Sequence, residues 1–317
     1  MNIIKNRYLY FLISLLVIIP GLVFMGLHWS ANPQEGPLPL GIDFRGGSLL
    51  EVQFAGTRPA PQDIQSIYGQ FATADEAISD PIIQPLGEDA YAIRSRSMSD
   101  ETKGKLVAAM EAKSGAAVTV QNFTSVSPSV GAEVTRAAGF AILMAAAAIL
   151  AYIWFAFRGV EHSFRYGTAA VIAMLHDVLV VLGVEAMLGY FLGWEADALF
   201  LTALLTVIGF SVHDTIVVFD RIRENSHIYR RIDYETLVNH SIVQTLDRSL
   251  TTQLTVMFTL TALALFGGES IRHFVLILLV GIFSGTYSSI FNAAPILVVW
   301  EKREWRDWFR RKEEAVF

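Results

Sequence analysis

The feature that most constrains this chain is an apolar run with an acidic residue inside it. Residues 198–219 are long enough to cross the ~30 Å hydrocarbon core of a bilayer as a helix, and Asp214 lies within this run, ahead of a charged segment at 220–225. An ionised carboxylate is costly at membrane depth, so it pairs, faces a cavity or exchanges protons. The run therefore predicts a membrane protein whose function depends on an intramembrane charge.

Composition agrees with several membrane spans. Only 17% of the residues are charged, against about 25% in soluble domains. Five more apolar runs occur, at 8–27, 139–157, 167–192, 249–266 and 274–300. The first is too long for the apolar h-region of a typical signal peptide and lacks an Ala-x-Ala cleavage site, so we interpret it as a retained span. With no cysteine and a net charge of −6, disulfides and thiolate zinc sites are excluded, and nothing indicates nucleic-acid binding.

The distribution of lysine and arginine orients these six spans. Basic residues precede the first span, follow the second and fourth, and are densest after the sixth, whereas 193–197 has none and 267–272 has one. By the positive-inside rule, both termini are cytoplasmic. The predicted parts are a first transmembrane helix at 1–29, an extracytoplasmic domain at 30–132, a five-helix bundle at 133–300 and a basic cytoplasmic tail at 301–317.

The segment 30–132 has the pattern of a folded α+β domain. Leu50, Val52 and Phe54 alternate as in a half-buried strand. Helices are predicted after Pro61, and between Ser99 and Gly115. Further strands are expected at 82–83, 91–93 and 118–120. The order β-α-β-β-α-β predicts a ferredoxin-like fold.

Several motifs resemble one known family. They read GIDFRGGSLLEV at 41–52, LHD at 175–177, IGFSVHDT at 208–215 and DRIREN at 220–225. Together with six spans and one outer domain, they resemble the SecF family, whose members are the smaller partners of SecD in the bacterial protein-translocation accessory complex and belong to the resistance-nodulation-division (RND) superfamily. The resemblance covers nearly the whole chain.

The resemblance implies a multi-pass protein of the bacterial inner membrane that uses the proton-motive force to promote translocation of secreted proteins. It also implies a SecD partner, contact with the SecYEG channel and with the translocating polypeptide, and surrounding membrane lipid. No cofactor or metal is implied.

Asp214 and Arg248 are the residues that the resemblance implies in proton coupling. Counted from the ends of their spans, the two can share a level in the membrane. Two structural interpretations stay open at this stage. Asp214 can cap a broken helix or bond to Ser211 and Thr215, and Arg248 can mark the membrane boundary by extending its side chain toward water.

Other polar residues in the spans have structural and functional interpretations. His176 and Asp177 fit a proton relay, but a helix–helix contact is favoured. His213 points about 100° away from its acidic neighbour on a helix and is interpreted as structural. Thr251 and Thr252 can hydrogen-bond water or pack between helices. Glu185 is expected to reach the membrane interface.

The run Asp43-Phe44-Arg45-Gly46-Gly47 precedes the first predicted strand. Its two glycines indicate a tight backbone. A phosphate-binding loop needs a strand before it and a helix after it, and this run has neither. The resemblance identifies the motif but assigns it no chemistry.

The chain has no His-Glu-x-x-His, Walker or Gly-x-Ser-x-Gly motif. We therefore expect no enzyme, and an ion gradient, of H⁺ or Na⁺, as the energy source. An RND-type small-molecule exporter and a non-conducting scaffold for SecD are the alternatives. An intramembrane aspartyl protease built on Asp177 and Asp214 lacks the expected Gly-x-Gly-Asp context.

Overall fold

The computed structural model describes the chain except for residues 1, 34, 73–77, 79–80, 159–162 and 305–317. Most of the predicted basic tail therefore lies outside the described residues. The chain divides into two compact units. One is helical and comprises Met1–Leu38, Ile142–Trp194 and Leu199–Phe317, and the other comprises Pro39–Ala141 and Glu195–Ala198.

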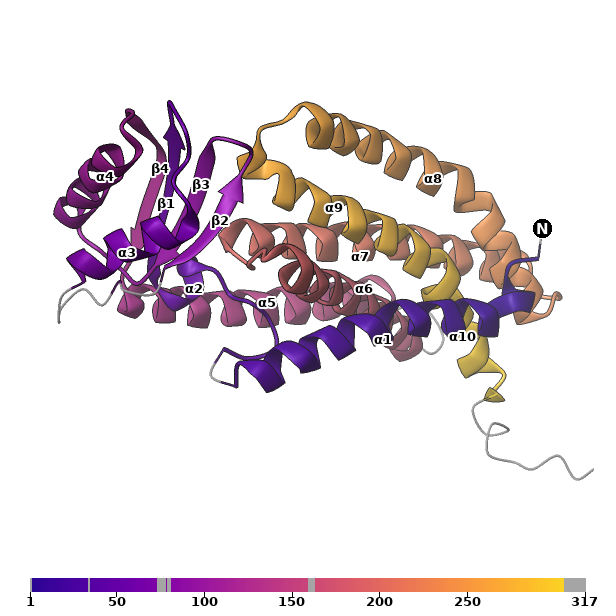
Figure 1. The fold of residues 1–317 in the computed structure, drawn as a ribbon. Coiled ribbons are helices and arrows are strands. Elements are labelled where there is room, and N and C mark those ends of the chain that lie inside the picture. Colours follow the sequence, from indigo (N-terminus) through magenta and orange to yellow (C-terminus); the bar gives the residue numbers. More distant parts are fainter. Residues whose placement is uncertain (1, 34, 73–77, 79–80, 159–162, 305–317) are drawn as a thin grey trace, which may run out of the picture. The chain divides into compact units, whose positions relative to one another are not determined.

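The helical unit contains the membrane-spanning elements. They are α1 (Arg7–Ala31, preceded by the 3₁₀ turn η1, Ile4–Asn6), α5 (Pro128–Ala156, whose first turns belong to the other unit), α6 (Ser163–Leu192), α7 (Ala198–Ile228), α8 (Tyr234–Phe266), α9 (Glu269–Ser288), η2 (Ser289–Ala293) and α10 (Ala294–Glu301). Among the described residues, six helices are long and apolar enough to cross a membrane. The predicted six-span fold class is thus confirmed. Figure 1 shows α8 running alongside α9.

Several helices extend past the apolar runs that predicted them. The run expected from 139 lies in a helix that begins at Pro128, and the run expected from 249 lies in a helix that begins after Asp233. Asp233 caps α8 by accepting a hydrogen bond from the Thr236 amide. This cap and the hydroxyl of Thr236 lower the pKa of Asp233. Helical hydrogen bonding thus continues into polar sequence, where hydropathy alone gives no signal.

Small residues allow the spans to pack closely. A Cβ on Gly21 of α1 would lie 2.5 Å from the Gly183 Cα of α6. On α9, a Cβ on Gly281 would lie 2.1 Å from a methyl of Val207 on α7. Glycine at these positions brings the backbones together and increases van der Waals contact, which is how membrane helices associate.

The last span is interrupted by one π-helical turn. Between α9 and α10, the residues Ser289–Ala293 of η2 form this wider turn. Pro295 follows it, and because proline has no N–H, it cannot donate to the carbonyl four residues earlier. Asn292 in the turn bonds to Ser14 of α1, at 2.8 Å from Nδ2 to Oγ. Single π turns in membrane and soluble helices occur frequently at functional sites.

The second unit is an α+β domain. Its elements are α2 (Ile42–Arg45), β1 (Gly47–Phe54), α3 (Pro61–Phe71), β2 (Ile82–Leu86), β3 (Ala90–Ser95), α4 (Asp100–Ser114) and β4 (Val118–Val126). In the described part of this unit the strands form one antiparallel sheet in the order β2-β3-β1-β4. This order, with α3 and α4 as the connections, is the predicted ferredoxin-like arrangement.

The local signals in the sequence explain this domain. The Ser99 hydroxyl accepts from the Thr102 amide at the start of α4, and Gly115 ends the helix in the left-handed conformation at φ 67°. Leu50 on β1 and Leu106 on α4 are completely buried in one apolar core between the sheet and its helices. Tyr68 on α3 lies in the same core, and burial raises the pKa of its hydroxyl.

Gly21→Ala tests the α1–α6 contact. The new methyl would meet the Gly183 backbone, and we expect the free energy of unfolding to fall by about 1–3 kcal/mol. Gly26→Ala on the same helix is the matched control, because a Cβ there meets nothing within 4 Å. Alanine favours a helix, so the control should be neutral or slightly stabilising. Thermal unfolding in detergent measures both, and equal effects would contradict the packing argument.

Candidate functional site

Asp177 lies near the middle of α6 and is completely buried. Three hydroxyls donate to its carboxylate: Ser211 of α7 at 2.5 Å, Ser284 of α9 at 2.7 Å and Ser288 of α9 at 2.6 Å. His176 Nδ1 lies 2.9 Å from Asp177 Oδ1. Three helices therefore meet at this carboxylate. Its three hydroxyl donors are uncharged, and His176 is a cation only when it is protonated.

Asp214 lies on α7 and is 4% exposed. Ser249 of α8 donates to its Oδ1 at 2.6 Å, and Ser289 of η2 donates to its Oδ2 at 2.5 Å. The sequence left open bonds from Ser211 and Thr215. Instead, Ser211 donates to Asp177, and the Thr215 hydroxyl donates to the Ser211 carbonyl.

The two aspartates belong to one polar layer, which we call the serine layer. Its members are Asp177, Asp214 and the serines that bond to them, Ser211, Ser249, Ser284, Ser288 and Ser289. Ser211 links the two halves, because it bonds to Asp177 and precedes Asp214 on the same helix by about 4.5 Å of rise. The layer is buried throughout, so its charges are separated from solvent within the monomer.

Two serines of this layer have a second acceptor within reach. Ser288 Oγ lies 2.6 Å from Asp177 Oδ2 and 3.2 Å from the Gly285 carbonyl. Ser289 Oγ lies 2.5 Å from Asp214 Oδ2 and 3.1 Å from the Thr286 carbonyl. A hydroxyl has one proton to donate and can also accept. When a carboxylate gains a proton, the serine can donate to its backbone carbonyl and accept from the new carboxyl, so no hydrogen bond is lost.

Arg248 is not among the donors to Asp214. Its side chain is exposed on α8, whereas the next residue, Ser249, bonds to Asp214. The arginine and the aspartate therefore share a level in the bundle but do not pair in this structure. Thr251 and Thr252 are also exposed on α8. The pairing of Asp214 with Arg248 stays a prediction.

The histidines differ in their surroundings. His176 is buried, and its ring stacks on Tyr287 with centroids 6.1 Å apart. His213 is exposed on α7 and faces away from the serine layer. Within the described residues, no group of three or more His, Cys, Asp or Glu side chains is placed to hold a metal ion.

The motif at 43–47 joins the α+β domain to the starts of two spans. Asp43 Oδ2 accepts from the Ala198 amide at 2.9 Å, which caps the first turn of α7. The Phe44 carbonyl accepts from the Thr135 hydroxyl of α5 at 2.9 Å. Gly46, at φ 77°, leaves no room for a side chain, because a Cβ would lie 2.7 Å from the Pro128 Cα. We call this set of contacts the motif clasp.

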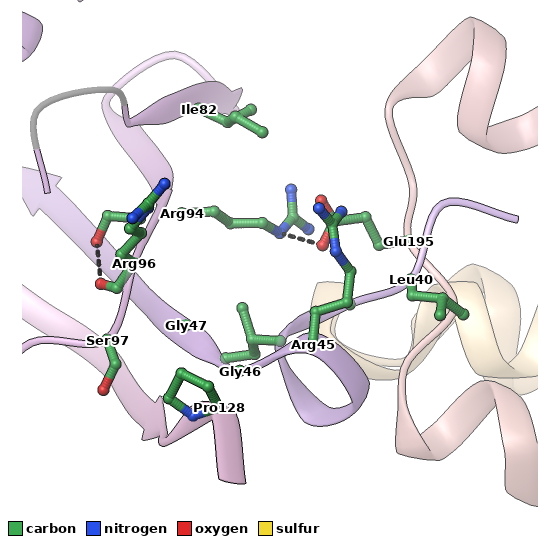
Figure 2. Close-up of a pocket in the computed structure, with 13 residues that line it drawn as sticks. Leu40, Arg45, Gly46, Gly47, Ile82, Arg94, Arg96, Ser97, Pro128 and Glu195 are labelled. Atoms are coloured by element: carbon green, nitrogen blue, oxygen red, sulfur yellow. Dashed lines mark hydrogen bonds and ion pairs between the residues drawn. The ribbon is translucent and has the colours of Figure 1, made fainter. Parts of the chain in front are cut away.

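A cavity of about 430 Å³ lies beside the clasp in the α+β domain. Figure 2 shows Arg45 and Arg94 approaching Glu195, with Gly46 and Gly47 along the wall. Arg94 Nε lies 3.2 Å from Glu195 Oε2, and its guanidinium also donates to Gln84 at 2.6 Å. The cavity is therefore basic, with one arginine neutralised by the loop that leads into α7.

Comparison with known families agrees with these features. A model described as "Protein export membrane protein SecD/SecF, C-terminal" matches residues 106–303, and one described as "SecD/SecF GG Motif" matches residues 36–57. The chain belongs to the SecD/SecF family. The second match contains residues 43–47, so the family's glycine pair corresponds to Gly46 and Gly47.

Individual proteins of this family also match the chain. The protein translocase subunit SecF of Anaerolinea thermophila is 53% identical, over 98% of this chain and 97% of that protein. That of Thermobaculum terrenum is 47% identical, over 98% of each. The crystal structure of SecDF, a translocon-associated membrane protein from Thermus thermophilus, matches with a TM-score of 0.77 and 29% identity. It covers 96% of this chain, which spans only 39% of that longer chain.

Sequence reasoning found both aspartates but missed most of the serines that hold them. Serines are common in membrane helices, and a single sequence does not show which of them face one another. The one available signal was spacing: Ser284 and Ser288 are separated by one helical turn and so share a face. A small residue also brings these helices together, because a Cβ on Gly285 of α9 would lie 3.3 Å from Ser211 of α7.

Gly131→Ala tests the fit of the clasp. A methyl at this position on α5 would lie 2.6 Å from the Gly46 nitrogen, whereas a methyl at Gly139 on the same helix meets nothing within 4 Å. We expect Gly131→Ala to lower the free energy of unfolding by about 1–3 kcal/mol relative to Gly139→Ala. Thermal unfolding and limited proteolysis of the α+β domain give the comparison. A Gly131→Ala protein as stable as the control would show that the contact is not tight.

Proposed function

We propose that this chain is the SecF subunit of the accessory complex of the bacterial Sec translocase, and that it uses the proton-motive force to promote translocation and release of secreted proteins. Membership of the SecD/SecF family supports the first part. The serine layer supports the second, because it places two buried carboxylates inside membrane-spanning helices.

Burying a carboxylate in its charged form costs free energy. In a low dielectric the neutral carboxyl is favoured, whereas hydrogen bonds to the charged form oppose this. Both effects act on Asp214, because it is buried and its carboxylate accepts hydrogen bonds from Ser249 and Ser289. The second acceptors of Ser288 and Ser289 allow either protonation state to be bonded. Such a site can gain and lose a proton without losing hydrogen bonds.

Arg248 supplies the opposite charge in this proposal. An arginine within a membrane span needs water, an anion or a protein partner. Its side chain is exposed at the level of Asp214, so a small rotation of α8 or a partner helix covering this face would change its distance from the aspartate. We propose that Arg248 and Asp214 pair in one state of the cycle and separate in the other, with Thr251 and Thr252 lining the water between them.

The partner in this proposal is SecD. The matched SecDF chain is more than twice as long as this one, so a second half of similar construction is expected beside α8. The SecYEG channel and the translocating polypeptide are the further partners. We place both termini in the cytoplasm and the α+β domain outside, on the basis of the lysine and arginine distribution.

The motif clasp gives a route from the proton site to the domain. Asp43 holds the first amide of α7, the helix that also carries Asp214. The distance along that helix, sixteen residues, is about 24 Å. We propose that a shift of α7 on protonation is transmitted through Asp43 to the α+β domain, which then moves the bound polypeptide.

Asp214→Asn tests proton coupling. The asparagine keeps the size of the side chain but cannot change charge. A charge that crosses about 100 mV carries about 2.3 kcal/mol, equivalent to a factor of about 50. We expect gradient-dependent export of a secreted reporter from inverted vesicles to fall by about tenfold or more, with gradient-independent export unchanged.

Asp247→Asn is the control, because this carboxylate is exposed on α8, two residues before Ser249. It should leave export as in the wild type. Full gradient dependence in Asp214→Asn would favour a non-conducting scaffold for SecD instead. Normal export in a deletion strain that becomes drug-sensitive would favour a small-molecule exporter, and dependence on a sodium gradient would replace H⁺ by Na⁺.

Asp43→Ala tests transmission through the clasp. Loss of the cap on α7 should reduce gradient-dependent export several-fold while chain levels and association with SecD stay normal. Asparagine also caps helix starts, so Asp43→Asn should recover most of the export. If alanine and asparagine behave alike, capping by Asp43 does not carry the motion.

A further inference from the structure

A second buried acidic group lies on α6, away from the serine layer. Glu185 is completely buried among protein side chains. Its Oε2 lies 2.7 Å from Nε2 of His273 on α9. Its Oε1 has no hydrogen-bond partner among the described residues. A buried carboxylate oxygen without a partner is costly, so an isolated structural bond explains this pair poorly.

The pair lies in the same helix interface as Asp177. Eight residues separate Glu185 from Asp177 on α6, about 12 Å of rise, and eleven separate His273 from Ser284 on α9, about 16 Å. Eleven residues are close to three turns, so His273 and Ser284 share one face of α9. Between the two polar sites are the buried apolar residues Val181 and Ile277. One interface thus carries two polar sites separated by an apolar layer.

Two aromatic rings lie close to His273. The His273 ring lies 4.6 Å from the Trp194 ring and 6.5 Å from that of Phe200, measured between centroids. Behind Glu185, α1 meets α6 through Gly21 and Gly183. His273 retains 18% of its side-chain exposure, whereas Glu185 has none. The histidine is therefore the more exposed member of the pair.

We infer that Glu185 and His273 form a second proton-binding site, at the C-terminal end of α6, in the same helix interface as the serine layer. This inference rests on the proposed proton coupling and extends it by naming the entry residues. On the proposed orientation this end of α6 faces the outside, where the proton-motive force supplies protons. His273 takes up a proton from water, and the proton on its Nε2 passes to Glu185 Oε2, 2.7 Å away.

The emission of Trp194 reports protonation of His273 directly, because an imidazolium this close to an indole quenches its fluorescence. The experiment uses the full chain with its SecD partner in liposomes, and subtracts the spectrum of Trp194→Phe to isolate this one tryptophan. We expect reversible quenching as the pH on the side of this helix end is lowered between about 8 and 5. Glu185→Gln should require at least about tenfold more protons, and His273→Gln should abolish the response.

Export in the same preparations provides the second measurement. Glu185→Gln should lose several-fold of its gradient-dependent export at unchanged chain level and melting temperature, whereas Glu133→Gln, on an exposed position of α5, should not. Trp194 emission that does not respond to pH in the wild type overturns the inference. So does a normal pH response with unimpaired export in Glu185→Gln.

The two proposals fail separately. If Asp214→Asn exports normally while the Trp194 response persists and is lost in His273→Gln, then proton binding at this site stands and the proposed motor function falls. If Asp214→Asn fails and Trp194 does not respond, the motor stands and protons enter elsewhere.

Discussion

The structure depends on how two carboxylates are accommodated in the apolar interior of a helix bundle. Asp177 and Asp214 each require donors, and the bundle supplies serine hydroxyls from the neighbouring helices. A hydroxyl is a weaker partner for a carboxylate than arginine or lysine, because it carries no charge. A hydroxyl can also accept, so the same serines can bond to a carboxylate or to a carboxyl. A fixed ion pair would instead stabilise the charged form alone and oppose proton exchange.

The geometry of α9 and its π turn explains how one helix holds both aspartates. Ser288 and Ser289 are adjacent, so their side chains point about 100° apart on a helix, and they bond to Asp177 on α6 and Asp214 on α7 respectively. The π turn begins at Ser289. A change in this turn would reposition both donors together. The hydrogen bonds of the two aspartates are therefore linked through neighbouring residues of one chain segment.

Much of this fold could be predicted from the sequence, and the reasons are local. Hydropathy is a property of each span alone, and the caps of α4 at Ser99 and Gly115 are set by neighbouring residues. The partners of Asp214 are not local, since Ser249 and Ser289 come from other helices. Their identity depends on the rotation of each helix about its axis, which packing determines. The same limit explains the burial of Glu185, because distance along one helix does not show what covers a residue.

The motif at 43–47 shows what the glycine pair contributes physically. It carries no nucleophile or phosphate cradle, and its role follows from space and capping. Gly46 lets the chain pass against the first turn of α5, and Asp43 holds the first amide of α7. Both helices continue into the bundle, and α7 carries Asp214. A side chain that only filled space at position 43 would not need a hydrogen-bond acceptor. Asp43 has one, and this acceptor holds the start of α7.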